Sequence, residues 1–506
     1  MNIIVRQGKI LSQIADLAVV ALYEKKKGKT ETWDLPDDPR AKTIADVLEE
    51  DGFSGRRDEW VSFRSFGNYR AKRIGVIGLG KREDIELDAF RLLGARMIKS
   101  AKGPKVYEIA VAFPAVDAGS LSLDRAIEAF AEGVWMGAYR FHPYQKKESK
   151  TGEGVEIKTV TIVIEQRSMV EACTAAVREA RVLSEATMLA RDLVNTPSME
   201  MTPARLAEVA KTVADTSDRI DIKIFDAQEM ETMGMHAALA IGRGSQHAPV
   251  GVHLTYHPTS EPKKRIVFVG KAVTFDSGGL SLKPSDSMTT MKIDMAGAAN
   301  VIGVFQALPL LAPDVEVHGI FLAVENMPSG TACRPGDVVK AKNGTTIEIL
   351  NTDAEGRVTL ADALSYASEL KPDALIDMAT LTGACVVALG EDVAGLLAND
   401  RPLADALLAV SRETGEALWE LPLYQPYLPM IKSKIADVKN TGGGRGAGTV
   451  TAALFLQQFV AKRIPWAHID IAGPSYAEKE TRSDFSFGGT GFGVRLFLRY
   501  LQGVSR

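Results

Sequence analysis

The stretch Asn351-Thr352-Asp353-Ala354-Glu355-Gly356-Arg357 carries two carboxylates one residue apart, followed by a guanidinium. It comes directly after residues 346–350, whose composition is typical of a short strand. In an extended or turn-like segment, residues two apart point the same way, so Asp353 and Glu355 are predicted to aim at one spot. Two carboxylates that close do not both stay ionised in a dry site without a cation between them. A metal ion is one candidate for that cation, and Arg357 alone is the other.

A second group of charged residues lies upstream, where the chain reads Val269-Gly270-Lys271-Ala272-Val273-Thr274-Phe275-Asp276-Ser277-Gly278-Gly279. The apolar run 266–269 predicts a buried strand, and the glycine-rich segment after it is expected to be its exit loop. This region brings Asp276, Lys283 and Asp294 into loops that follow strands. In α/β proteins such loops build the functional sites.

The two lysines are predicted to do different work. A lysine ligates a metal only as the neutral amine, so Lys271 would lose its proton to the adjacent dication. Lys283 lies farther along the loop and is better placed as a charged group that polarises a substrate carbonyl. A surface lysine is the common alternative for each. The neighbouring glycines favour a site, because glycine stands where backbone turns sharply or approaches something closely.

These motifs resemble the signatures of the leucyl aminopeptidase (cytosol aminopeptidase) family of two-metal exopeptidases, and the resemblance extends from Asn195 to the C-terminus. Residues 1–165 resemble the family only loosely. Ala272, Ala296 and Val358 depart from the family's usual Gly, Gly and Leu without removing a coordinating atom. Further segments that carry the resemblance are Met291-Lys292-Ile293-Asp294-Met295, Glu325-Asn326-Met327-Pro328, Arg334-Pro335-Gly336-Asp337, Ala379-Thr380-Leu381-Thr382-Gly383-Ala384, Trp466-Ala467-His468-Ile469-Asp470 and Gly489-Thr490-Gly491-Phe492-Gly493.

The resemblance implies two divalent metal ions, zinc or manganese, although mostly oxygen ligands also accept cobalt or magnesium. It implies that Asp276 and Glu355 bridge the two ions. It also implies catalytic roles for Lys283, which would stabilise the oxyanion, and for Arg357, which would hold a bicarbonate that acts as general base. The metal ligands that it implies are Lys271, Asp276, Asp294, Asp353 and Glu355.

Four further residues in the motif segments are expected to bind the substrate: Met291, Thr380, Leu381 and Gly383. They are expected to line a pocket for an apolar side chain, with ordinary core packing as the alternative for Met and Leu. The activity that the resemblance implies is removal of the N-terminal amino acid from peptides, with leucine and other apolar residues preferred. It further implies a cytoplasmic homohexamer.

Composition limits the other classes of function. The 506 residues are 46% hydrophobic and 25% charged, as is usual for a soluble enzyme. The net charge of −4 does not imply a nucleic-acid partner, so DNA binding on the same scaffold is only the alternative function. Three scattered cysteines favour a reducing compartment. No apolar run approaches the ~18 residues of a membrane span, and the N-terminus lacks the apolar stretch of a signal peptide.

The order of strand and helix patterns predicts an α/β fold in two domains. Residues 1–167 are expected to form a smaller domain with a mostly parallel sheet, and residues 168–200 a linker with a long helix over 168–193. Residues 201–506 are expected to form the catalytic domain, a central mixed sheet flanked by helices. Its expected elements are helices over 204–214, 297–311 and 360–369 and strands over 220–225, 250–256, 317–324 and 374–378.

Five other local features also allow predictions. Residues 75–80 contain three glycines after a strand, which is typical of a nucleotide loop or of a plain strand-to-helix turn. His253 and His257 are four residues apart, but a strand pattern separates them by roughly 13 Å and disfavours a zinc pair. Residues 442–446 are expected to form a flexible loop more than an anion cradle. Asn343-Gly344 predicts a type I′ hairpin turn, and residues 145–154 an exposed charged loop.

Overall fold

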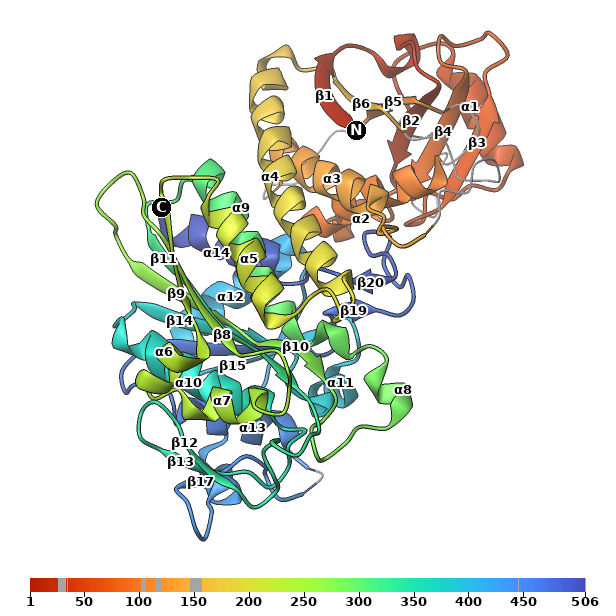
Figure 1. Ribbon diagram of the computed structural model, residues 1–506. Helices are drawn as coiled ribbons and strands as arrows, with labels where there is room; N and C mark the ends of the chain where they lie inside the picture. Colours follow the sequence, from red (N-terminus) through yellow and green to blue (C-terminus); the bar gives the residue numbers. More distant parts are fainter. Residues whose placement is uncertain are drawn as a thin grey trace. The chain divides into compact units, whose positions relative to one another are not determined.

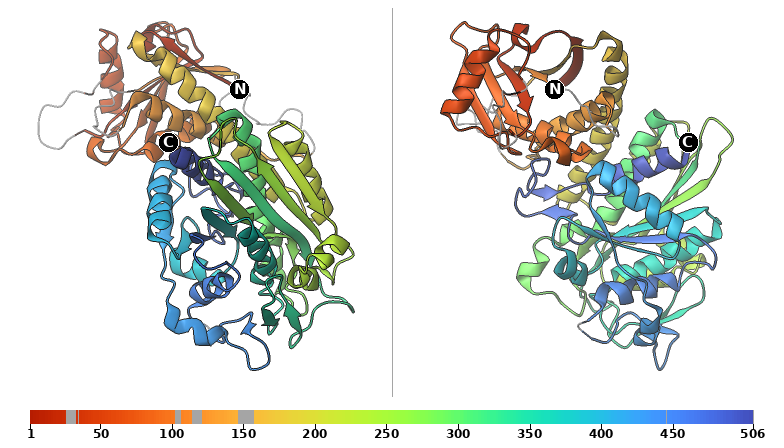
Figure 2. Two further views of the ribbon diagram at one scale, coloured as in Figure 1. Left: turned by 90° about the vertical axis from the view of Figure 1, so that its left-hand side faces the viewer. Right: turned by 180° about the vertical axis from the view of Figure 1, so that it is seen from behind.

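The computed structural model describes residues 1–25, 33, 35–101, 106–113, 121–145, 157–444 and 446–505. These residues divide into two compact units, each built on a sheet with helices on both faces (Figures 1 and 2). Unit 1 comprises Met1–Ser184 and Glu480–Ser486, and unit 2 comprises Glu185–Lys479 and Phe487–Arg506. The predicted α/β fold in two domains is confirmed.

The boundary between the units lies within α4 (Val170–Asn195), the long helix that was expected over residues 168–193. Each half of this helix therefore packs with a different unit. The domain limits expected from the sequence, 167/168 and 200/201, stay a prediction.

The sheet of unit 1 has the strand order β1-β6-β5-β2-β4-β3, and only its β3–β4 pair is antiparallel among the described residues. Both faces of β2 are buried, because its alternate residues pack into cores on opposite sides of the sheet. The elements of unit 1 before α4 are β1 (Asn2–Gln7), η1 (Ile10–Ser12), β2 (Leu17–Leu22), α1 (Ala41–Glu50), β3 (Trp60–Arg64), β4 (Arg73–Gly78), η2 (Arg82–Asp84), α2 (Leu87–Ser100), β5 (Glu108–Ala112), α3 (Leu123–Ala138), β6 (Thr159–Ile164) and η3 (Arg167–Met169).

The glycines of residues 75–80 serve close packing. A Cβ on Gly78 would lie 1.9 Å from the carbonyl oxygen of Arg56, so only glycine fits there. The two amides that follow Gly78 donate to backbone carbonyl oxygens elsewhere in unit 1. Because these amides are already used, the segment is a strand-to-helix turn and does not form a phosphate cradle.

The large sheet of unit 2 has the order β16-β15-β18-β14-β9-β11-β8-β7, and β10 pairs with β11. Helices α9 and α14 cover one face, and α7, α10 and α13 cover the other (Figure 1). The elements of unit 2 are α5 (Pro203–Ala214), β7 (Ile220–Phe225), α6 (Ala227–Thr232), α7 (His236–Gly242), β8 (Val250–Tyr256), β9 (Arg265–Gly270), β10 (Ala272–Asp276), α8 (Ser285–Met288), η4 (Met291–Met295), α9 (Ala296–Leu311), β11 (Glu316–Asn326), β12 (Val338–Lys340), β13 (Thr346–Glu348), α10 (Gly356–Glu369), β14 (Ala374–Ala379), α11 (Gly383–Leu389), β15 (Ala394–Ala398), α12 (Arg401–Thr414), β16 (Leu418–Glu420), η5 (Gln425–Ile431), β17 (Val438–Lys439), α13 (Gly448–Gln457), β18 (Trp466–Asp470), β19 (Tyr476–Ala477), β20 (Gly488–Gly489) and α14 (Val494–Ser505).

The central strands of this sheet, β18, β14, β9 and β11, run parallel, so their carboxyl ends meet at one edge. Sites in α/β proteins form at this edge, where chain leaves the strands. Four polar residues stand there: Lys271 directly after β9, Thr380 directly after β14, Asp470 at the end of β18 and Asn326 at the end of β11.

The expectation that Asp276 lies in an exit loop is wrong. Asp276 ends a second strand, β10, which pairs in parallel with the last part of β11. Up to Gly270 the chain forms β9, which pairs with both β14 and β11. After Lys271 it forms β10, which pairs with β11 only. The glycine-rich turn therefore begins at Ser277, and the position of Asp276 is fixed by the sheet.

Two other local expectations need correction. The helix expected over residues 360–369 begins earlier, at Gly356, directly after Glu355.

The hairpin around Asn343-Gly344 is present as β12 and β13, but its turn is not type I′. Gly344 has a φ of 91°, whereas Asn343 is not among the residues with positive φ. The turn is therefore a type I turn followed by a left-handed glycine, the geometry of a three-residue hairpin loop.

The stretch Met291–Leu311 is long and apolar enough to cross a membrane by length and composition alone. However, 78% of its most apolar window is buried inside the structure. Its main part, α9, packs against β9 and α14. This packing is that of a core helix of unit 2.

The two histidines of β8 and its end take different partners. His253 Nε2 lies 2.9 Å from His318 Nδ1, and His253 Nδ1 lies 2.9 Å from the hydroxyl of Tyr366. His257 pairs with the carboxylate of Asp221 instead. As the strand spacing predicted, the side chains of His253 and His257 do not converge on one position.

Two segments fall partly outside the described residues. Of the loop expected over 145–154, only residue 145 is described, and Arg445 in the segment 442–446 is not described.

Candidate metal centre

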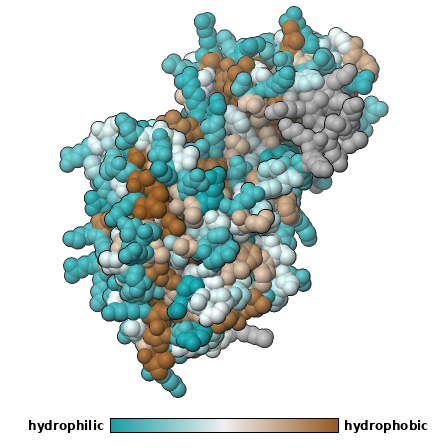
Figure 3. Space-filling model, viewed as in Figure 1, coloured by the Kyte–Doolittle hydropathy of each residue, from teal (hydrophilic) through white to brown (hydrophobic). Residues whose placement is uncertain are grey.

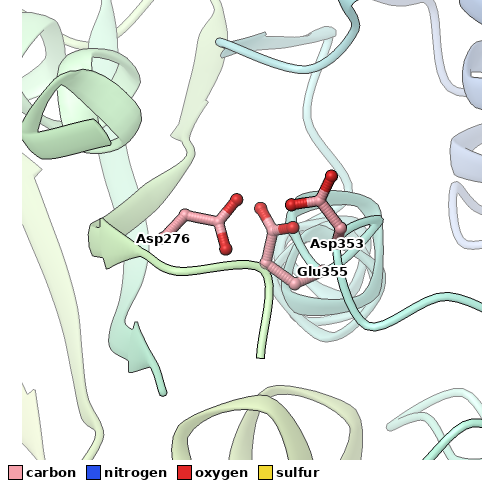
Figure 4. Close-up of side chains that lie close together, drawn as sticks. All are labelled: Asp276, Asp353 and Glu355. Atoms are coloured by element: carbon pink, nitrogen blue, oxygen red, sulfur yellow. The ribbon is translucent and has the colours of Figure 1, made fainter. Parts of the chain in front are cut away.

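Three carboxylates converge at the carboxyl edge of the large sheet (Figure 4). Asp276 ends β10, Asp353 lies in the turn after β13, and Glu355 precedes the first residue of α10. One oxygen of each lies within 4.8 Å of the others. The prediction that Asp353 and Glu355 face one spot in an extended or turn-like segment therefore agrees with the geometry, in which Asp353 lies in a turn and Glu355 at the start of a helix.

Lys271 lies between two carboxylates. Its Nζ is 2.7 Å from Asp294 Oδ1 and 2.8 Å from Glu355 Oε1, and it donates to the carbonyl oxygen of Thr380 at 3.0 Å. These three acceptors match the three N–H groups of an ammonium ion. Gly356 makes room for this side chain, because a Cβ there would lie 2.5 Å from Nζ.

Lys283 bridges the other two carboxylates of the site. Its Nζ lies 2.9 Å from Asp276 Oδ2 and 2.5 Å from Asp353 Oδ1. The turn that returns Lys283 to this position passes through Gly278 and Gly279, whose φ angles of 85° and 63° are left-handed. Such angles favour glycine, which accounts for the Gly-Gly pair in the sequence.

Hydrogen bonds from neutral groups orient two of the carboxylates. Asn326 Nδ2 donates to Asp276 Oδ1 at 2.8 Å, and the amide of Gly278 donates to the same oxygen at 2.8 Å. The hydroxyl of Thr380 donates to Asp294 Oδ1 at 2.7 Å. In each carboxylate these neutral donors contact only Oδ1, and a hydrogen bond from a neighbouring group to one oxygen is the usual way to orient a metal ligand.

The charges of the site are unbalanced. Burial raises the pKa of Asp276 and of Asp353, and raises that of Asp294 well above its ordinary value. Burial would also raise the pKa of Glu355, but the neighbouring Lys271 lowers it. Burial alone would lower the pKa of Lys271, yet the surrounding carboxylates raise it. The four carboxyl groups of Asp276, Asp294, Asp353 and Glu355 face only two ammonium groups in a largely buried space, which is why burial dominates these pKa values.

This donor set fits divalent cations. Oxygen donors outnumber the positive groups, and Asp294 Oδ2 is buried without a hydrogen-bond partner among the described residues. A cation held by several carboxylates would remove the electrostatic cost of that excess charge. The residues that could hold it are Lys271, Asp276, Asp294, Asp353 and Glu355.

Arg357 brings a buried positive charge to the same cavity. It is 9% exposed, lies in the first turn of α10, and makes no ion pair with a carboxylate among the described residues. Burial lowers its pKa, which the charges of Glu355 and Asp470 oppose. A guanidinium that is not paired with a carboxylate is a suitable partner for a planar anion.

These residues line one cavity of about 410 Å³. The four residues expected to bind substrate, Met291, Thr380, Leu381 and Gly383, all line it. All seven residues expected to act in catalysis or metal binding line it too. The structure thus brings together every residue that the sequence singled out for the site.

Other lining residues were not singled out from the sequence: Pro284, Ser287, Ile293, Ala354, Gly356, Thr382, Val386 and Ala472. Most are small or apolar and carry no chemical signal of their own. Asn326 was also missed as the residue that orients Asp276. Its position as a polar residue that ends a long apolar strand is the signal that could have identified it.

Comparison with known proteins bears on both units. The family model of the cytosol aminopeptidase family, catalytic domain, matches residues 188–498. The model of the N-terminal domain of the same family matches residues 19–148. The N-terminal region, whose sequence resembles the family only loosely, thus also matches a domain of this family.

Individual relatives agree with the family models. A probable cytosol aminopeptidase of Aquifex aeolicus is 46% identical over 91% of this chain and 90% of its own length. One of Persephonella marina is 45% identical over 90% of both chains. Among solved structures, a tomato leucine aminopeptidase variant matches with a TM-score of 0.88 at 34% identity, covering 99% of this chain and 96% of its own. The bottromycin maturation enzyme BotP in complex with Mn matches with a TM-score of 0.85 at 35% identity, covering 97% and 100%.

Proposed function

The chain belongs to the cytosol aminopeptidase family and is a peptidase, and from this premise we propose a two-metal aminopeptidase that prefers apolar N-terminal residues. The observation that carries the proposal is the cage of four carboxylates and two lysines at the floor of a single cavity. The Mn complex of the similar BotP structure supports metal binding at this fold.

We assign the metal ligands to Lys271, Asp276, Asp294, Asp353 and Glu355. Divalent ions bound there, zinc or manganese with cobalt or magnesium as further candidates, would supply Lewis acidity and an activated water. Lys271 would have to lose a proton to act as a ligand, and its ammonium contacts with Asp294 and Glu355 would be replaced.

Lys283 and Arg357 are the cationic groups proposed to act on the substrate. Lys283 is 14% exposed and at the cavity wall, so its ammonium can donate to the oxygen of a peptide carbonyl as negative charge develops there. The fork of Arg357 can hold a planar anion such as bicarbonate, which would act as the general base. With all four carboxylates of the cage assigned to metal binding, none of them is left for that role.

The preference for apolar N-terminal residues is supported by the cavity wall. Met291, Ile293, Leu381, Val386 and Ala472 present apolar surface within the same cavity as the cage. Burial of an apolar side chain against such a wall contributes roughly 1.5–3 kcal/mol of binding free energy.

Metal removal tests this function. The full-length protein is dialysed against a chelator and assayed on leucine amide, and then Mn²⁺ or Zn²⁺ is restored. We expect loss of activity with the metal and its return on restoration, and no cleavage of N-acetylated leucine amide at any stage. Undiminished activity in the metal-free protein would refute the proposal.

The cytoplasmic location and a homohexameric state belong to the same proposal. The relatives are named probable cytosol aminopeptidases, and the three cysteines are buried and free of disulfides, which together support a reducing compartment. Figure 3 shows apolar residues in patches among polar ones on one face, and exposed apolar side chains such as Trp419 and Val387 are available for contacts between copies. Sedimentation at micromolar concentration tests the assembly, and a monomer would contradict it.

DNA binding, a function of another class, stays a prediction. The net charge of −4 offers no electrostatic support for it. A gel shift at moderate salt tests it, and the absence of a shifted band would remove it.

A further inference from the structure

Residues 380–382 form a strip of the cavity wall that is attached to the metal cage at one end. The carbonyl oxygen of Thr380 accepts from Lys271 Nζ at 3.0 Å, and the Thr380 hydroxyl donates to Asp294 at 2.7 Å. The position of Thr380 is therefore set by two residues of the cage.

The other end of the strip is attached to a single carboxylate, that of Asp470. Asp470 Oδ1 accepts the amides of Leu381 at 3.1 Å and Thr382 at 3.4 Å, and also that of Ala472 at 3.2 Å. Its Oδ2 accepts the hydroxyl of Thr382 at 2.6 Å. Asp470 has no exposed surface, so water does not compete for these contacts.

The register of the sheet puts the carboxylate at this place. Asp470 ends β18 directly opposite Ala379, the last residue of β14, from which the strip leaves. The two strands are parallel, so the end of one lies beside the exit of the other. Leu381 and Ala472, which the same oxygen contacts, both line the cavity.

The influence of Asp470 extends to the next helix. The hydroxyl of Thr382 accepts the amide of Cys385 at 3.1 Å and so caps the N-terminus of α11. Gly383 and Val386 of that helix also line the cavity. One buried carboxylate thus holds two wall segments and the start of a helix.

We propose that Asp470 is a positioning residue that fixes the apolar wall relative to the metal cage and thereby sets the preference for large N-terminal side chains. This proposal rests on the proposed aminopeptidase function. Asp470 does not line the cavity and acts only through residues 380–382 and Ala472. A shift of about 1 Å in a substrate-positioning segment costs on the order of 100-fold in rate.

The test compares turnover of leucine amide and alanine amide by the metal-loaded, full-length protein. We expect Asp470→Ala to lower kcat/KM for leucine amide by about 100-fold and to reduce the leucine-to-alanine preference by about tenfold. Asp470→Asn keeps one oxygen for the backbone amides and an amino group beside the Thr382 hydroxyl. We expect this variant to keep the preference within about twofold of wild type.

A readout other than turnover is thermal stabilisation by the free amino acids. We expect L-leucine to raise the melting temperature of the wild type more than L-alanine does, and this difference to disappear in Asp470→Ala. If that variant does not fold, Thr382→Val and Thr382→Ser take its place. Valine keeps the shape but loses the bond to Asp470, and we expect only the valine variant to lose the preference.

Asp362 provides the matched control. It is also fully buried, and its carboxylate accepts the amides of Ala238 and Lys342, but it does not line the cavity. Asp362→Ala should lower the melting temperature without changing the leucine-to-alanine preference. An unchanged preference in Asp470→Ala and in Thr382→Val would overturn the positioning role. Absence of turnover in the metal-loaded wild type would instead contradict the proposed function.

Discussion

Gly356 packs directly against the side chain of Lys271, and a Cβ at this position would lie 2.4 Å from Cε. It stands in the first turn of α10 with no positive φ, so alanine fits the backbone, and the three atoms nearest to the added Cβ all belong to the lysine. The sequence alone gives no reason for a glycine between Glu355 and Arg357, because the contact is with Lys271, which lies between β9 and β10.

We expect Gly356→Ala to displace the amine of Lys271 and to lower kcat/KM by about 100-fold. Metal content measured by mass spectrometry should fall in parallel. Gly503→Ala is the control, because Gly503 is also helical but a Cβ added to it would meet nothing within 4 Å. Full metal content with full activity in Gly356→Ala would show that Lys271 is not needed in the cage.

Asp362 gives a pH-dependent prediction. Burial raises its pKa to about 7, although the amides of Ala238 and Lys342 oppose this. A folded-state pKa above the unfolded value of 3.8 means that the folded state holds the proton between pH 4 and 7. The contribution of Asp362 to stability is therefore present below pH 4 and is lost as pH rises to about 7, by a few kcal/mol.

The measurement is the free energy of unfolding of wild type and Asp362→Asn at pH 5 and pH 8. The amide cannot titrate, but it leaves one backbone amide without an acceptor at a cost of about 1–3 kcal/mol. We expect Asp362→Asn to be the less stable protein at pH 5 and the difference to shrink or reverse at pH 8. A difference that is the same at both pH values would show that Asp362 is ionised throughout.

At the level of helices and strands, apolar runs and capping residues predicted most elements. The strand expected over 220–225 is β7, and the helix expected over 204–214 is α5, which Thr202 caps with Pro203 in its first turn. The start of α10 was missed because Gly356 is a poor helix former. The strand β10 was missed because its pairing with β11 depends on the register of the whole sheet.

Helix α9, which begins beside Asp294, ends with an unfavourable residue. Its C-cap, Ala312, is exposed and has a left-handed φ of 48°. Glycine adopts this conformation without the steric cost that a Cβ imposes. We therefore expect Ala312→Gly to raise the free energy of unfolding of unit 2 by about 0.5–1 kcal/mol.

The same substitution inside a helix should have the opposite sign. Ala409 is exposed within α12, and Ala409→Gly should destabilise by about 1 kcal/mol. Thermal unfolding of both variants measures the two opposite changes in stability. A loss of stability in Ala312→Gly similar to that in Ala409→Gly would contradict the assigned cap.

For the whole molecule, the sequence predicted two domains but not their composition. The segment Glu480–Ser486 belongs to unit 1, although it is distant in sequence from the rest of that unit. Its contacts with the rest of unit 1 include two ion pairs, Lys99 with Glu480 at 2.8 Å and Arg482 with Asp88 at 3.0 Å. Such pairs leave no periodic pattern in a sequence, so this return of the chain was not predictable. The site was predictable because its residues are chemically distinctive and follow strands of one sheet.

All residues assigned to the metal cage lie in unit 2, so metal binding should stabilise the two units unequally. A ligand that binds only the folded state stabilises it by about 2.7 kcal/mol at a free concentration one hundred times Kd. We expect calorimetry to resolve two transitions, of which Mn²⁺ or Zn²⁺ raises only one. Hydrogen exchange should assign that transition, with added protection in β10 and α10 and none in α2 or α3.

Asp353→Asn is the control for this experiment, because it removes one carboxylate from the cage without changing its size. The variant should keep both transitions and show a smaller metal-induced shift. An equal shift of both transitions, in the wild type and in Asp353→Asn alike, would mean that the metal acts elsewhere than in the cage. A shift confined to unit 2 and reduced by Asp353→Asn ties the metal to the carboxyl edge of the large sheet, independently of any measurement of catalysis.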